Sequence, residues 1–303
     1  MNFSTKIEIV PLKKRVCYSH KLLFMGSCFA SEIGERLLSL RFDIRVNPFG
    51  VLYNPASITM SLERLENGRL LEADELIKSG DIHKSFMHGS EFAAMSIEDF
   101  LEKNNAILRD ASDHFEKSEW VAISLGTSWV YRLKESGQIV SNCHKLPSSC
   151  FGREILSVEE IVSSLSPIIE RHSGKEWIFT VSPIRHWKDG AHGNQLSKAR
   201  LLLAVEELCA KYCNVHYFPA YELMMDELRD YRFYANDMLH PSSLAIDCIW
   251  GRFAEFAIAD NAAPRMKKVD ALNAMRNHKP IFPDSKEYEI FMDNMEKLEK
   301  ELN

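Results

Sequence analysis

Short apolar runs alternate with amphipathic stretches along most of the chain, and this alternation predicts an α/β fold. Five runs have the length and composition of buried strands and are followed by turn residues: 22–25, 43–46, 121–125, 177–181 and 215–218. Helical patterns lie between most of them, the clearest at 195–212, where leucines recur on one face and charged residues on the other. This order of elements favours a parallel sheet covered by helices on both faces.

One α/β domain is predicted over residues 1–260, with two additions. Residues 55–115 are too many for a simple connection between strands, so we expect a helical insertion or cap that helps to shape a pocket. Residues 261–303 are rich in charge and contain Pro280 and Pro283, which break helices. They are expected to form a C-terminal helical extension that ends in a helix near 288–302.

The turn at Gly26-Ser27 separates a strand pattern from a helix pattern. Apolar residues 22–25 precede it, and apolar residues recur every four positions from Phe29 onwards. Such a turn lies at the carboxyl edge of the sheet, where ligands bind, and the following helix directs its free N–H groups at that place. Ser27 could be a nucleophile there, although a tight turn and a helix N-cap also favour a small hydroxyl residue for structural reasons alone.

A carboxylate and an imidazole stand three residues apart before the last apolar stretch of the α/β region. Asp237 and His240 precede a predicted helix that begins near Leu244. On a turn or a first helical turn, this spacing places both side chains on one side. Asp237 can then hold one ring nitrogen of His240 while the other faces a serine hydroxyl, as a general base requires. The pair alone is weak support for catalysis.

Together these segments resemble the GSCFA-domain family, a branch similar to the SGNH/GDSL hydrolases. Residues 26–30, Gly-Ser-Cys-Phe-Ala, match the signature that names the family. Further blocks resemble it in the same order, at 47–55, 124–131, 142–145, 180–186, 218–222 and 228–241. The resemblance covers about residues 20–255 and implies a flavodoxin-like three-layer sandwich with a central parallel sheet.

The resemblance also implies roles for individual residues. Ser27 maps to the nucleophile, and Asp237 and His240 complete a catalytic triad. The oxyanion hole would use the backbone N–H of Ser27, the N–H of a glycine, for which Gly50 is the candidate, and an Asn side chain.

The asparagine expected by the resemblance is missing. Residues 126–128 are Gly-Thr-Ser where Gly-x-Asn is expected. Thr127 or Asn54 could replace the missing donor, and losing one such donor raises a reaction barrier by about 3 kcal/mol. The departure therefore leaves two hypotheses open, an enzyme of reduced activity and a binding or scaffolding protein that kept the fold.

Further polar residues are candidates for substrate contact, namely Asn54, His88, Arg185 and His186. Arg185 and His186 follow the fourth predicted strand at the carboxyl edge, and His88 would line the pocket if the insertion folds over it. The alternative for both histidines is an ordinary loop residue. No histidine pair has the spacing of a zinc site, so no metal is expected.

Cys28 is a rival nucleophile, because a helix N-terminus stabilises a thiolate. The resemblance assigns that role to Ser27 instead, and a buried apolar role is the alternative for Cys28.

Composition argues against nucleic-acid and membrane partners and favours a reducing compartment. The chain has 303 residues, a net charge of −6 and no basic stripe with interleaved aromatics, so a nucleic-acid partner is not expected. No segment approaches eighteen consecutive apolar residues, and the first ten residues lack a signal-peptide core, so no membrane partner is expected. Seven scattered cysteines without Cys-x-x-Cys pairs favour free thiols and a cytoplasmic location.

The leading hypothesis is a serine esterase that needs no cofactor. By family resemblance, the substrate is a small-molecule or carbohydrate ester from which a small acyl group such as O-acetyl is removed. A third hypothesis is a phosphate- or nucleotide-binding protein. The sequence lacks the glycine-rich fingerprint that such a protein needs, because Gly26 and Gly34 stand too far apart. The sequence leaves the oligomeric state open.

Overall fold

A five-stranded parallel sheet forms the centre of the molecule, which we describe from a computed structural model over residues 5–302. Its strands are β1 (Lys21–Gly26), β2 (Asp43–Val46), β5 (Trp120–Leu125), β9 (Glu176–Val181) and β10 (Val215–Tyr217). The order β10-β9-β5-β1-β2 is the flavodoxin-like order, with the switch point between β1 and β5. All five predicted strands are confirmed, each end within one residue of the prediction.

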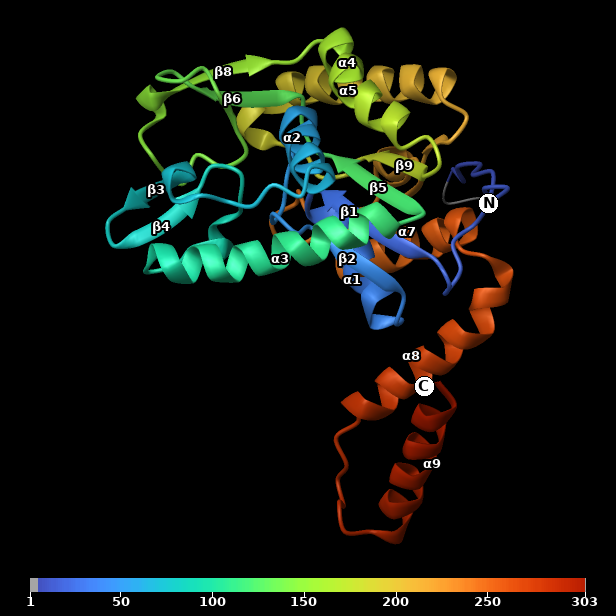
Figure 1. Cartoon of the computed structure of the whole chain (residues 1–303). Helices are drawn as coiled ribbons and strands as arrows, with labels where there is room; N and C mark the ends of the chain where they lie inside the picture. The colour runs from blue at the N-terminus through green and yellow to red at the C-terminus, as the bar shows by residue number, and fades with distance from the viewer. Residues whose placement is uncertain (1–4, 303) are drawn as a thin grey trace.

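Helices cover both faces of the sheet (Figure 1). On one face lie α1 (Cys28–Ser39) and α7 (Ser243–Ala257), packed on alternate strand residues such as Leu22 and Phe24. The other face carries α2 (Pro55–Glu66), α3 (Ile97–Lys117), α4 (Val158–Arg171) and α5 (Gly190–Lys211), packed on Leu23, Met25 and their neighbours. Because successive side chains of a strand point to opposite faces, each strand contributes to both cores. The predicted three-layer sandwich is confirmed.

Two small antiparallel sheets flank the central one and were not predicted. The first is a hairpin of β3 (Leu76–Ser79) and β4 (Ile82–Ser85), which lies inside the segment expected to be helical. The second joins β7 (Ile139–Val140), β6 (Trp129–Leu133) and β8 (Phe151–Ile155) in that order. Since β6 begins directly after the Gly-Thr-Ser segment, this second sheet stands beside the carboxyl edge of the central sheet.

Short helical segments occupy several connections. They are η1 (Ala73–Glu75), η2 (Ser90–Phe92), η3 (Ser148–Cys150), η4 (Trp187–Asp189), α6 (Ala220–Glu222), the π-helical η5 (Leu223–Glu227), η6 (Tyr231–Phe233) and η7 (Asp260–Ala262).

The chain ends in a pair of helices that projects away from the body, coloured orange to red in Figure 1. They are α8 (Ala263–Asn277) and α9 (Lys286–Leu302), so the predicted C-terminal helix is present. Leu272 and Leu302 join the hydrophobic core on the α1 side, and the Asn273 side chain donates to the backbone oxygen of Ser39 at 2.8 Å. Within residues 5–302, no helix has both the length and the hydropathy needed to cross a bilayer.

Phe218 is a suitable test of the core beneath α7. Its ring is fully buried and meets the rings of Phe253 and Phe256 with centroids 5.2 and 5.4 Å apart. We expect Phe218→Ala to lower the free energy of unfolding by about 3–5 kcal/mol, because it removes buried apolar area and leaves a cavity. Denaturant unfolding would measure this, with the exposed Ile281→Ala, expected to change stability by less than about 0.5 kcal/mol, as the control. A loss below about 1 kcal/mol for Phe218→Ala would contradict the packing described.

Candidate functional site

The turn between β1 and α1 brings Ser27 against the end of β5. Gly26 has φ +130°, and a Cβ placed on it would lie 2.2 Å from the backbone oxygen of Ser124, so only glycine allows this approach. Ser27 then donates its backbone N–H to that same oxygen at 2.9 Å. Its side chain is the N-cap of α1 and accepts the N–H of Phe29 at 3.3 Å. The capping role foreseen for Ser27 is therefore present in the structure.

The hydroxyl of Ser27 has a partner that sequence reasoning missed. The Oγ atoms of Ser27 and Ser124 lie 2.7 Å apart, and both residues are buried. Asn47 supports the same turn, because its Oδ1 accepts the N–H of Gly26 and its Nδ2 donates to Ser31, both at 2.8 Å. Ser124 and Asn47 each begin one of the sequence blocks noted above, but the residue types alone assign them no role.

Asp237 and His240 form a closed unit on the turn before α7. The Nδ1 of His240 lies 2.5 Å from Oδ2 of Asp237, while Oδ1 of Asp237 accepts the backbone N–H groups of Leu239 and His240 at 2.9 Å each. Met238 has φ +62°, and this left-handed residue lets the chain turn back between the two. The N–H groups of His240 and Leu239 and the imidazole together lower the pKa of Asp237 to about 2, so the carboxylate stays ionised well into acid.

Ser27 and His240 line the same cavity, which has a volume of about 560 Å³ and opens at the carboxyl edge of the sheet. Within residues 5–302 no hydrogen bond joins the two side chains, and the Ser27 hydroxyl is bonded to Ser124 instead. Catalytic hydrogen bonds are often long or misaligned before substrate binds. The structure thus brings Ser27 and His240 to one cavity, and Asp237 holds the ring of His240 through Nδ1.

The residues expected to form an oxyanion hole differ in whether their donors already have acceptors and in whether they line the cavity. The N–H of Ser27 donates to Ser124 and that of Gly50 donates to the oxygen of Asn47 at 2.7 Å, so each already has a backbone acceptor. Gly50 is buried and is not among the residues that line the cavity. Thr127 does line it, with its Oγ1 3.0 Å from the hydroxyl of Ser197.

Asn54 also lines the cavity and is the N-cap of α2. Its Oδ1 accepts the N–H of Ser57 at 2.8 Å, while its Nδ2 donates no hydrogen bond within residues 5–302. Of the two candidates to replace the missing asparagine, Asn54 therefore presents an uncommitted amide donor.

His186 and His88 have different surroundings. His186 lines the cavity beside Tyr53, with ring centroids 5.4 Å apart, and burial followed by the charge of Lys198 lowers its pKa to about 4. His88 is only 1% exposed, packs against the rings of Phe49, Phe92 and Phe100, and does not line the cavity. The folded insertion encloses His88 instead of presenting it, so the structure gives its expected substrate contact no support.

Several residues of the cavity wall were not foreseen. Trp129, Tyr131 and Arg153 come from the small sheet that follows the Gly-Thr-Ser segment, and Trp187 and Lys188 come from η4. The alternation of large side chains at 129 and 131 was the available signal, since it is typical of a strand with one covered face.

A buried lysine joins the ends of two central strands. The ammonium group of Lys198 on α5 donates to the backbone oxygens of Gly126 and Ser182, at 2.7 Å each. These oxygens follow β5 and β9, so Lys198 ties together two strand ends at the place where the expected asparagine is missing. Burial lowers the pKa of Lys198 to about 7.

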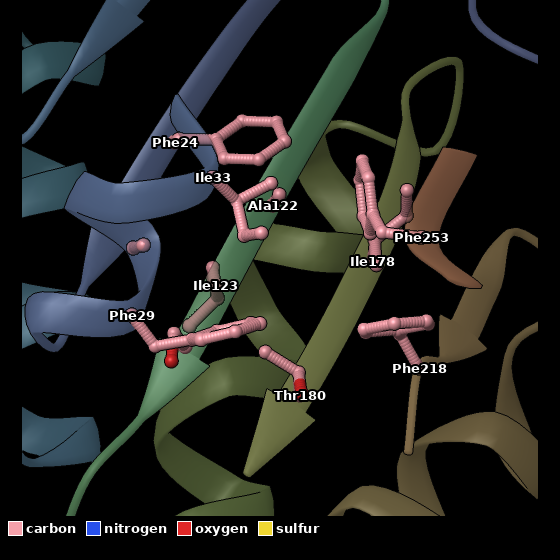
Figure 2. Close-up of a pocket in the computed structure, with 11 residues that line it drawn as sticks. Phe24, Phe29, Ile33, Ala122, Ile123, Ile178, Thr180, Phe218 and Phe253 are labelled. Atoms are coloured by element: carbon pink, nitrogen blue, oxygen red, sulfur yellow. The ribbon is translucent and has the colours of Figure 1, made fainter. Parts of the chain in front are cut away.

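A second cavity, of about 20 Å³, lies between the sheet and the layer of α1 and α7. Figure 2 shows the rings of Phe24, Phe29, Phe218 and Phe253 around it, together with Thr180. No ionisable side chain lines this space, so it offers no acid, base or charged binding group. The cavity of about 560 Å³ is the candidate site, because Ser27 and His240 line it. In the described part of the chain, no group of three His, Cys, Asp or Glu side chains could hold a metal ion.

These features define a flavodoxin-like α/β protein with a serine, an imidazole and a carboxylate at the carboxyl edge of its sheet. The chain belongs to the GSCFA family, whose model matches residues 21–253. Searches of curated proteins and of solved structures gave no significant match.

His88 leads to a prediction about acid stability. Burial lowers its pKa to about 3, and neither ring nitrogen has a partner within residues 5–302. The unfolded chain therefore binds one more proton between the ordinary pKa of 6.5 and about 3. The free energy of unfolding is therefore highest, as far as His88 is concerned, above about pH 6.5. It falls as the pH drops from 6.5 to about 3, by up to about 1.4 kcal/mol per pH unit.

We expect His88→Leu to reduce the slope of unfolding free energy against pH in this window by up to that amount, because leucine keeps the apolar packing and binds no proton. Denaturant unfolding at a series of pH values would measure the slope. An unchanged slope would show that His88 titrates normally.

Proposed function

We propose that the protein is a serine ester hydrolase of the SGNH type. The observation that carries the proposal is that Ser27, at the N-terminus of α1, and His240, whose Nδ1 is held by Asp237, line one cavity at the carboxyl edge of the sheet. This arrangement contains a nucleophile, a base and a group that orients the base.

The proposed reaction starts with a change of partner for the Ser27 hydroxyl. It leaves Ser124, gives its proton to Nε2 of His240 and attacks the ester carbonyl carbon, while Asp237 holds the proton on Nδ1. His240 then protonates the departing alcohol as the C–O bond breaks, which leaves an acylated Ser27. Water, deprotonated by His240, releases the acid and restores the hydroxyl. The amide of Asn54 is the uncommitted donor for the oxyanion, with the N–H groups of Ser27 and Gly50 and the hydroxyl of Thr127 as the other candidates.

The cavity wall supports a substrate with a sugar-like ring. Tyr53 and Trp187 line the cavity and are 38% and 55% exposed, and Trp129 lies on the same wall. Aromatic faces of this kind offer apolar area with polar edges, which suits the faces of a carbohydrate. We therefore propose removal of a small acyl group, such as O-acetyl, from a carbohydrate or a small molecule. We also propose a cytoplasmic location, supported by seven free cysteines.

Two observations favour the second candidate function, a binding or scaffolding protein. The Ser27 hydroxyl is bonded to Ser124, and the backbone N–H groups of Ser27 and Gly50 have backbone acceptors. Cys28 stays a rival nucleophile, since its Sγ lines the same cavity 3.7 Å from the hydroxyl of Tyr53.

Labelling by a fluorophosphonate, with peptide mapping by mass spectrometry, tests for an activated hydroxyl without knowledge of the substrate. We expect one adduct on Ser27, lost in Ser27→Ala and His240→Ala and kept in Cys28→Ala. An adduct on Cys28, or none on a folded protein, would contradict the proposal, and the latter would favour the binding protein.

Asp237→Asn tests the orientation of the base. We expect it to slow labelling of Ser27 by about 10²–10⁴-fold, because an amide in place of the carboxylate no longer fixes the His240 tautomer. The rate of adduct formation against time measures the effect. Asp247→Asn is the matched control and should label at the wild-type rate, because Asp247 is an exposed carboxylate on α7 that pairs with Arg36 on α1. Equal rates for all three proteins would exclude Asp237 from the mechanism.

A further inference from the structure

Arg185 lies in the same cavity as Ser27 and His240 but has no part in the reaction proposed above. It follows β9 at the carboxyl edge of the sheet, and its side chain is half-buried. A guanidinium in such a position loses part of its hydration, and this cost is normally offset by a carboxylate or by several carbonyl acceptors.

Arg185 has neither kind of partner. Within residues 5–302, its guanidinium forms no ion pair and donates to no oxygen atom. Its Nε is buried and has no hydrogen bond. The one hydrogen bond is from Nη2 to the Sδ of Met225 at 3.1 Å, and a thioether is a weak acceptor. The guanidinium of Arg185 thus has a single weak acceptor among the described residues, in the same cavity that Ser27 lines.

The other charges of the cavity do not neutralise Arg185. Asp189 is the one carboxylate among the described residues that line it, and Asp189 pairs with Arg153. Lys188 donates to the hydroxyl of Tyr131 at 2.7 Å and adds a further positive charge. The cavity therefore carries an excess of positive charge in a chain whose net charge is −6.

We propose that Arg185 binds an anionic group, a carboxylate or a phosphate, carried by the substrate. Both groups present two oxygens to the fork of a guanidinium and would satisfy the donors that the protein leaves open. The proposal rests on the proposed function in one respect, since it calls the bound molecule a substrate. It deepens that function, because it selects acylated acidic sugars or other acylated anions over neutral esters.

Three acetate esters with a common acyl group separate charge from reactivity: phenyl acetate, 4-acetoxybenzoate and 4-acetoxyphenyl phosphate. Each would be assayed with wild type, Arg185→Gln and Arg185→Lys, and each variant is compared with wild type on the same ester, so that intrinsic reactivity cancels. Arg132→Gln is the matched control, because Arg132 pairs with Glu154 on the small sheet and does not line the cavity.

We expect Arg185→Gln to lower kcat/KM for at least one anionic ester by about 10- to 100-fold, as for a lost hydrogen bond between charged groups, and for phenyl acetate by less than about 2-fold. The kcat/KM of Arg185→Lys for that ester should lie between those of wild type and Arg185→Gln, since lysine keeps the positive charge but loses the paired N–H donors of the guanidinium. The anionic ester that suffers the larger loss identifies carboxylate or phosphate. Equal losses on all three esters would indicate a structural role and overturn the proposal, as would no loss on any.

Binding separates this proposal from the proposed function. If wild type hydrolyses none of the esters, the esterase proposal fails, and calorimetric titration with 4-hydroxybenzoate and 4-hydroxyphenyl phosphate then decides the anion site. Binding to wild type that Arg185→Gln weakens about 10-fold or more supports it. Absence of binding, or equal binding to both proteins, overturns it.

Discussion

The close approach of the β1–α1 turn to the end of β5 is the constraint on which the site depends. Gly26 passes so near the backbone of Ser124 that any side chain would collide with it, and the N–H of Ser27 bonds to the oxygen of that residue. This contact crosses the switch point of the sheet, where the connections that follow the two parallel strands β1 and β5 leave toward opposite faces of the sheet and a cavity opens. The position of Ser27 is therefore set by main-chain packing and does not rely on the rotamer of a flexible side chain.

The five central strands could be predicted because both of their faces are buried, which produces short uninterrupted apolar runs such as 121–125. The strands of the small sheet are half-exposed and interrupted by charges such as Arg132 and Glu154, so their pattern is weak. Asp237 and His240 could be predicted as a pair because they interact across three residues of one turn. The Ser27–Ser124 contact spans 97 positions and depends on strand order, which no local pattern encodes.

The burial of His88 also could not be predicted from the sequence. A histidine in a polar loop favours exposure by its residue type, yet the insertion folds so that three phenylalanine rings surround it. Its burial results from contacts with Phe49 outside the hairpin and with Phe100 on α3, which only the assembled fold brings together. Burial of an uncommitted imidazole costs stability unless the ring stays neutral, which agrees with its lowered pKa.

The resting state of Ser27 bears on whether the site is catalytic. Exchanging the Ser124 hydroxyl for the imidazole of His240 replaces one neutral hydrogen bond by another, a difference of about 1 kcal/mol, which is small beside a reaction barrier. The backbone N–H groups of Ser27 and Gly50 are less free, because each already donates to a backbone oxygen, that of Ser124 and that of Asn47. If the proposed hydrolase is correct, oxyanion stabilisation therefore falls to donors outside the turn. The amide of Asn54 fits this role, because Asn54 lines the cavity, its capping bond to α2 holds the side chain, and its Nδ2 donates no hydrogen bond within residues 5–302.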